Sequence, residues 1–75
     1  MKKLGDHLYV FGDTCQVYII KNGSYAVLVD FGSGEVLDRL KDIGVVRVTD
    51  ILITHHHRDQ VQGLKRANEL GIAVW

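Results

Sequence analysis

Three of the four histidines in the chain are consecutive, at His55, His56 and His57. In an extended or tightly turned backbone, alternate side chains project to the same side, so His55 and His57 can converge while His56 points away. Two imidazoles are half of a tetrahedral zinc site. Asp59 follows two positions later and is placed to add an oxygen ligand or to hold a metal-bound water. The spacing therefore predicts a metal site or its remnant.

Other interpretations of this segment are an incidental solvated loop and an affinity tag. The run is internal, between an apolar strand and the start of a helix, whereas tags stand at chain ends. Open α/β sheets also place their ligands at the carboxyl ends of strands. Two weaker candidates are interpreted structurally: Cys15 as a small buried thiol, and residues 32–34 (Gly-Ser-Gly) as a helix cap, because they lack the lysine and spacing of a phosphate-binding loop.

The elements that must position these residues follow from hydrophobic periodicity. Asn22-Gly23 lies between two β-rich runs and predicts a hairpin whose two turn residues accept positive φ. Ser33 is placed to cap the first helix and Gly44 to end it in the left-handed conformation. We expect strands over residues 7–11, 16–21, 25–30, 50–54 and 72–75, and helices over residues 35–43 and 60–70. The order βββαβαβ predicts an α/β (α+β layered) fold with helices on one face of a sheet.

The composition excludes several classes of protein. Nine Lys and Arg balance nine Asp and Glu, which argues against a nucleic-acid-binding arm and a polybasic membrane patch, since both need clustered cations. No apolar run approaches the roughly 20 residues of a membrane-spanning helix, and no secretory signal is visible. A single cysteine, Cys15, fits a reducing compartment. We therefore expect a soluble, cytoplasmic protein.

The length allows one small domain, residues 1–75. Chains of this size bury only about 60% of their unfolded surface and are marginally stable. The sequence ends on an apolar run, residues 72–75, which would expose an unpaired strand edge. We therefore expect an incomplete, truncated domain that needs a missing carboxyl-terminal half or self-association.

The chemistry-bearing segment resembles a known motif. Residues 54–59 (Thr-His-His-His-Arg-Asp) are similar to the Thr-His-x-His-x-Asp-His motif of the metallo-β-lactamase superfamily, and Gly63 matches the glycine three residues beyond it. Residues 30–32 (Asp-Phe-Gly) resemble the earlier Asp-x-Gly signature of that family. The element order also matches the amino-terminal half of the family's αββα sandwich.

The resemblance implies roles for individual residues. His55 and His57 would be ligands of a first metal, Asp59 a ligand of a second, and Asp30 a structural acid near the site. Gln60 stands where the family has a second-metal histidine, and a glutamine carbonyl is a much weaker zinc donor than imidazole. We therefore expect zinc as the cofactor, as one ion rather than two, with iron or manganese as alternatives.

The resemblance also implies a function. The intact parent would be a metal-dependent hydrolase in which a metal-bound water attacks an ester, thioester, amide, lactone or phosphodiester in a small-molecule substrate. Asp59 would orient or partly deprotonate that water. This chain would supply only the first half of the site, because the family's remaining ligands come from the other half of the sandwich. The alternative is a catalytically degenerate or truncated member that acts as a non-enzymatic binding or oligomerisation module.

Overall fold

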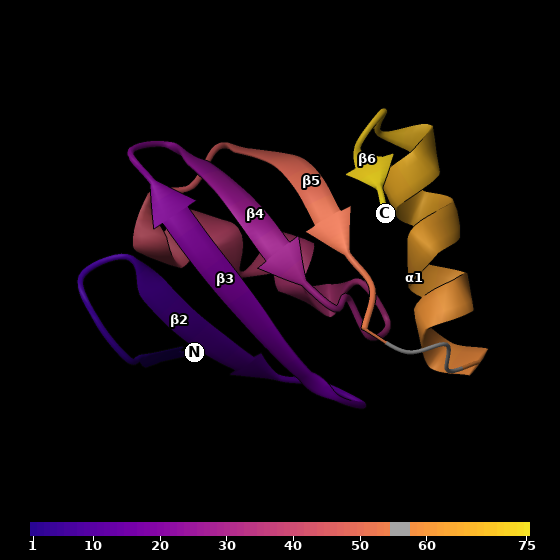
Figure 1. Cartoon of the computed structure of the whole chain (residues 1–75), viewed down its shortest axis with the longest axis horizontal. Coiled ribbons are helices and arrows are strands. Elements are labelled where there is room, and N and C mark those ends of the chain that lie inside the picture. Colours follow the sequence, from indigo (N-terminus) through magenta and orange to yellow (C-terminus); the bar gives the residue numbers. More distant parts are fainter. Residues whose placement is uncertain (55–57) are drawn as a thin grey trace.

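A six-stranded mixed sheet with the strand order β1-β2-β3-β4-β5-β6 forms the body of the structure (Figure 1). This computed structural model describes residues 1–54 and 58–75, and the side chains of residues 58–62 lie outside the described part. The strands are β1 (Lys2–Lys3), β2 (Leu8–Gly12), β3 (Gln16–Asn22), β4 (Tyr25–Val29), β5 (Arg47–Leu52) and β6 (Ala73–Val74). The helices are η1 (Glu35–Asp38) and η2 (Leu40–Ile43), both 3₁₀, and the α-helix α1 (Arg58–Glu69).

Strands β2, β3 and β4 form the expected antiparallel meander. The hairpin between β3 and β4 is confirmed, but Asn22 pairs with Tyr25, so the turn residues are Gly23 and Ser24. Only Gly23 has a positive φ, of 61°. A glycine with positive φ at the first central position is typical of a type II′ turn, and the prediction of two positive φ angles is wrong.

The second half of the sheet is parallel. Strand β5 pairs with β4 and β6 in parallel, so helical segments must cross over between these strands. β5 begins three residues earlier than expected and ends at Leu52, two residues before the expected end. The physical reason for the early end is that the Thr54 amide donates to the Asp30 carboxylate rather than to a neighbouring strand.

The helix expected over residues 35–43 is instead two short 3₁₀ helices. They are separated at Arg39, whose φ of −106° departs from helical geometry. The expected cap at Ser33 is also wrong, since Gly34 occupies that position with φ 89° and no side-chain cap is formed. Gly44 ends η2 with φ 76°, as predicted.

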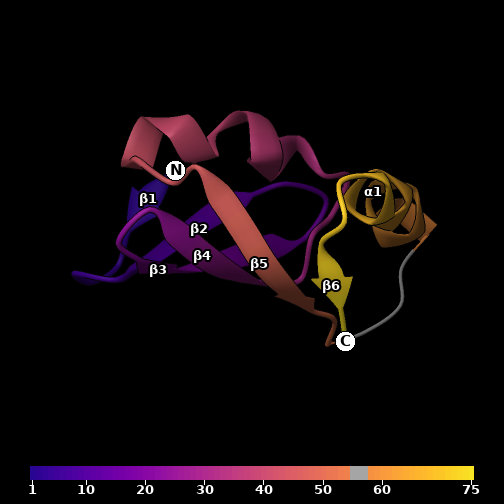
Figure 2. The same cartoon turned by 90° about the horizontal axis from the view of Figure 1, so that it is seen from above.

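Helix α1 confirms the helix expected over residues 60–70, with its start two residues earlier and Gly71 in the left-handed conformation after it. Figure 2 shows η1 and η2 over one face of the sheet and α1 beside β6. Ala67 of α1 is fully buried, and Leu64 packs against the same core. The core therefore lies between the sheet and one layer of helices, and its largest fully buried side chains are Phe31, Ile19, Leu28, Ile51, Val17 and Val36.

The opposite face of the sheet is apolar and open. Strand register places Val10, Tyr18, Val29 and Leu52 in one row across β2 to β5. A parallel row holds Leu8, Ile20 and Val27. Several of these side chains are exposed, among them Ile20 at 45% and Tyr18 at 40%. None of the helices in the described part of the chain is long and apolar enough to cross a membrane.

Candidate metal centre

Asp30 fixes the residue that precedes the histidine run. It follows β4 with φ 66° and is 6% exposed, a conformation that costs free energy for a residue other than glycine and that clusters at functional sites. Its carboxylate accepts hydrogen bonds from the Thr54 amide at 2.9 Å and from the Thr54 hydroxyl at 2.6 Å. The Asp30 amide donates to the Leu52 carbonyl at 2.7 Å. The end of β5 is therefore held by a buried carboxylate.

Residues 30–34, which we call the 30–34 turn, are also held from the turn between β2 and β3. The Asp13 carboxylate accepts hydrogen bonds from the Ser33 amide at 3.1 Å and from the Ser33 hydroxyl at 2.8 Å to its nearer oxygen. Gly32 has φ 58°, and a Cβ there would lie 2.8 Å from the Asp13 carboxyl carbon. The Ser33 hydroxyl therefore closes a contact between two loops, which is why it does not cap a helix.

Helix α1 touches the same turn through backbone atoms. A Cβ added at Gly63 would lie 2.6 Å from the Gly32 carbonyl oxygen, 2.8 Å from the Phe31 ring and 3.0 Å from the Gly34 nitrogen. No side chain fits at such distances. The glycine after the histidine motif is therefore required by the close approach of α1 to the 30–34 turn.

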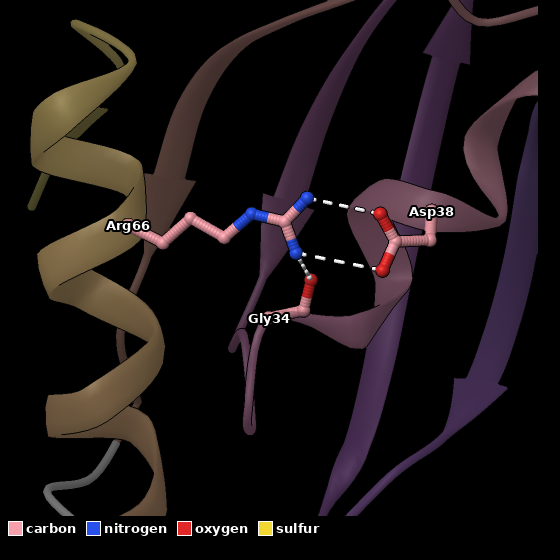
Figure 3. A network of polar contacts seen from close by, with 3 residues as sticks. All are labelled: Gly34, Asp38 and Arg66. Atoms are coloured by element: carbon pink, nitrogen blue, oxygen red, sulfur yellow. Dashed lines mark hydrogen bonds and ion pairs between the residues drawn. The ribbon is translucent and has the colours of Figure 1, made fainter.

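Arg66 makes a second contact one helical turn further along α1. Its guanidinium binds the Asp38 carboxylate of η1 at 2.9 Å and 3.5 Å, and donates to the Gly34 carbonyl at 3.4 Å (Figure 3). The hydrogen bond from Arg66, together with its charge, holds the pKa of Asp38 below its ordinary value. The contact therefore joins α1, η1 and the end of the 30–34 turn.

The family follows from comparison with known proteins. A family model described as the metallo-beta-lactamase superfamily matches residues 10–74. The chain belongs to this superfamily. It is 39% identical over 49 residues to a hydroxyacylglutathione hydrolase from Tolumonas auensis, an alignment that covers 64% of this chain and 19% of that hydrolase.

A solved structure gives the same fold. The crystal structure of the DIM-1 metallo-beta-lactamase matches 97% of this chain and 39% of its own, with a TM-score of 0.72 and 15% sequence identity. The α/β fold predicted from the sequence is therefore confirmed as that of a metallo-beta-lactamase. The chain spans about a fifth of the hydrolase and about two fifths of the lactamase that it matches.

The residues predicted as ligands in this superfamily member are only partly placed. His55 and His57 lie outside the described residues. Asp59 and Gln60 are the second and third residues of α1, and their side chains lie outside the described part. Among the described residues, no three His, Cys, Asp or Glu side chains come together as a metal site. The ligand set therefore stays a prediction from the motif.

Cys15 lies near the 30–34 turn, with its thiol beside the Gly32 backbone. No local pattern in the sequence indicates this contact. Its thiol is partly buried, so the interpretation as a buried thiol is confirmed in part. Burial raises the pKa of Cys15, the negative charges of Asp30 and Asp13 raise it further, and a hydrogen bond with the Gly32 backbone partly offsets them. The thiol therefore stays protonated, and unreactive as a nucleophile, to higher pH than an exposed one.

A groove of about 380 Å³ lies at the opposite end of β5 from Thr54. It is lined by side chains at the start of β5 and by residues that follow α1, including Arg47, Leu70 and Ile72. Large pockets are common places for substrate. In this superfamily member, however, the groove is at the amino end of a parallel strand, whereas α/β sheets bind ligands at the carboxyl ends. We therefore place the candidate site at Thr54 and not at the groove.

Proposed function

We propose that this chain supplies the first part of the metal centre of a hydrolase that acts on a small-molecule ester or thioester. The observation that carries the proposal is the pair of anchors around the motif. Thr54 is bonded to the buried Asp30 carboxylate, and α1 returns against the 30–34 turn at Gly63. The hydroxyacylglutathione hydrolase relative supports hydrolysis as the reaction class. Amides, lactones and phosphodiesters remain alternative substrates, since one fold hosts many activities.

The donor set fits zinc, and iron or manganese, in its chemistry. Imidazoles at His55 and His57 and a carboxylate at Asp59 are ligands that these ions accept. Asp30 is not among the proposed ligands, because both of its carboxylate oxygens accept hydrogen bonds from Thr54. Gln60 offers only a neutral carbonyl oxygen, which favours one ion over two. Further ligands must come from outside these residues.

Each part of the chain has a role in the proposed mechanism. A metal held by His55, His57 and Asp59 would supply a Lewis acid that activates water and polarises the scissile carbonyl. The Asp59 carboxylate has two oxygens, and the one that does not bind the metal would orient the attacking water and accept its proton. The amino end of α1 favours negative charge at Asp59, since the unpaired amides of a helix start carry partial positive charge. Asp30 holds Thr54 in place through its two carboxylate oxygens.

Alanine substitution of the three histidines tests the proposed ligands. Zinc affinity is measured by competition with a chromophoric chelator, and His56→Ala is the matched control. We expect His55→Ala and His57→Ala each to weaken binding at least 10- to 100-fold, the range seen when only the partners of ligands are removed. His56→Ala should leave the affinity unchanged. Equal losses in all three variants would show that the motif is aligned in the wrong register.

A non-enzymatic oligomerisation module is the second candidate, and the open apolar face of the sheet favours it. Contiguous exposed apolar surface on a small protein marks an interaction site. Ile20 lies within this face, and Gln16 starts the same strand on the same face. If a second copy covers the face, sedimentation should show a dimer that Ile20→Glu dissociates and Gln16→Glu does not. A monomeric unmodified chain would contradict this candidate.

A further inference from the structure

The 30–34 turn contacts the chain on both sides of the histidine motif. On the amino side, Asp30 at the start of the turn binds Thr54. On the carboxyl side, α1 meets the turn at Gly63 and Arg66. A displacement of α1 relative to this turn therefore changes the position of the first turn of α1 relative to Thr54.

The contact at Gly63 does not fix the orientation of α1 by itself. It is a close approach of backbone atoms at one point, and apolar packing of Leu64 and Ala67 against the core is not directional. Arg66 lies three residues after Gly63, so both face the same side of the helix. Its planar guanidinium binds Asp38 with two nitrogens and reaches the Gly34 carbonyl with one of them. Planar two-nitrogen contacts of this kind restrict geometry as well as distance.

The ion pair between Arg66 and Asp38 is largely exposed to solvent, which bears on whether it stabilises the fold or orients α1. The side chains of Arg66 and Asp38 are 45% and 63% exposed, and exposed ion pairs contribute little to stability. The pair nevertheless joins α1 to a segment that is far from it in the sequence, the end of the 30–34 turn and the adjoining η1 (Figure 3). A directional contact that stabilises weakly is suited to fixing an orientation.

We propose that Arg66 is a positioning residue for the metal centre. Through Asp38 and the Gly34 carbonyl, it holds α1 in the orientation that places Asp59, on the first turn of the helix, relative to Thr54. This inference rests on the proposed function, because Asp59 matters only if a metal binds beside it.

The test compares metal binding with stability in the same variants. Arg66→Met keeps the aliphatic stem and removes the guanidinium, Arg66→Lys restores the charge without the planar geometry, and Lys65→Met is the control at the neighbouring exposed cation. Zinc affinity is measured by chelator competition, coordination by the absorption spectrum of the Co²⁺-loaded chain, and stability by thermal melting. If a variant fails to fold, Asp38→Ala removes the contact between Arg66 and Asp38 from the other side.

We expect Arg66→Met to weaken zinc binding about tenfold, the lower end of the range for residues that orient ligands, and to change the Co²⁺ spectrum. Its melting temperature should stay close to that of Lys65→Met, and Arg66→Lys should recover part of the affinity. Unchanged affinity and spectrum in Arg66→Met, with zinc binding that depends on His55 and His57, would overturn the positioning role alone. Zinc binding that neither His55→Ala nor His57→Ala weakens would overturn both proposals.

Discussion

Replacing Gly63 with alanine tests whether the backbone contact between α1 and the 30–34 turn holds the fold together. The added Cβ would lie 2.6 Å from the Gly32 carbonyl oxygen, whereas ordinary contacts begin at 3.4 Å. The two backbones must therefore separate by roughly 0.8 Å along this direction. The neighbours cannot yield cheaply, because they are backbone atoms and the ring of Phe31, which is fully buried.

The expected change in stability is the difference between two effects. Overpacking a well-packed site costs about 1–3 kcal/mol. Alanine gains about 1 kcal/mol over glycine from its higher helix propensity. Because the neighbours are backbone atoms and a buried ring, we expect a cost in the upper part of that range, about 2–3 kcal/mol. The net loss in the free energy of unfolding is then about 1–2 kcal/mol, which for a domain of this size lowers the melting temperature by about 4–16 °C.

The assay is thermal melting followed by far-ultraviolet circular dichroism, with Gly5→Ala as the matched control. Gly5 has no heavy atom within 4 Å of an added Cβ, so its replacement should leave the melting temperature unchanged or slightly raised. A Gly63→Ala variant that melts at or above the unmodified chain would show that α1 does not rest on the 30–34 turn. The reasoning about the positioning of Asp59 would then fail with it.

Three further substitutions and titrations address the same region. Asp30→Asn replaces one oxygen that accepts from Thr54 by a donor and should lower the free energy of unfolding in urea by about 1–3 kcal/mol. Alkylation of Cys15 by iodoacetamide should reach half its maximal rate above pH 9.0, the ordinary pKa of a cysteine thiol, because the pKa of Cys15 is raised in the folded chain. The protonated thiol contributes its full stability below pH 9.0, and this contribution is lost as the pH rises through the folded pKa. An Asp30→Asn background should move that midpoint downward. In the intact parent protein, Gln60→His should raise bound zinc, measured by elemental analysis, from near one ion per chain toward two.

The antiparallel strands were predictable because each is a short run of β-branched and aromatic residues bounded by turn residues. Which residues of these runs face the core was not predictable. In β3, the buried Val17 and Ile19 alternate with the exposed Tyr18 and Ile20, but all four are apolar in the sequence, because the opposite face of the sheet is apolar as well. The hairpin was predictable from Gly23. The two turn residues are Gly23 and Ser24 rather than Asn22 and Gly23, a shift of one residue along the chain.

The segment of residues 35–43 was not predictable in detail because its apolar spacing fits two structures. Val36 and Leu40 are buried, as one face of an α-helix would require, but the same spacing is satisfied by two consecutive 3₁₀ turns. Short helices depend on tertiary contacts more than on propensity. Here Gly34 enters the segment in the left-handed conformation, and Arg39 interrupts it.

The contacts of the candidate site could not be derived from local sequence, since their partners are distant along the chain. Asp30 and Thr54 are 24 residues apart in the sequence, and Asp13 and Ser33 are 20 residues apart. The resemblance to the family motif nevertheless predicted a structural role for Asp30. The structure gives the physical reason: the buried Asp30 carboxylate accepts hydrogen bonds from both the amide and the hydroxyl of Thr54. Two errors in the prediction share this origin: Ser33 bonds to Asp13 instead of capping a helix, and Thr54 bonds to Asp30 instead of extending β5. In both cases a long-range carboxylate competes successfully with local backbone structure, which is how the chain holds the turn that flanks its proposed metal ligands.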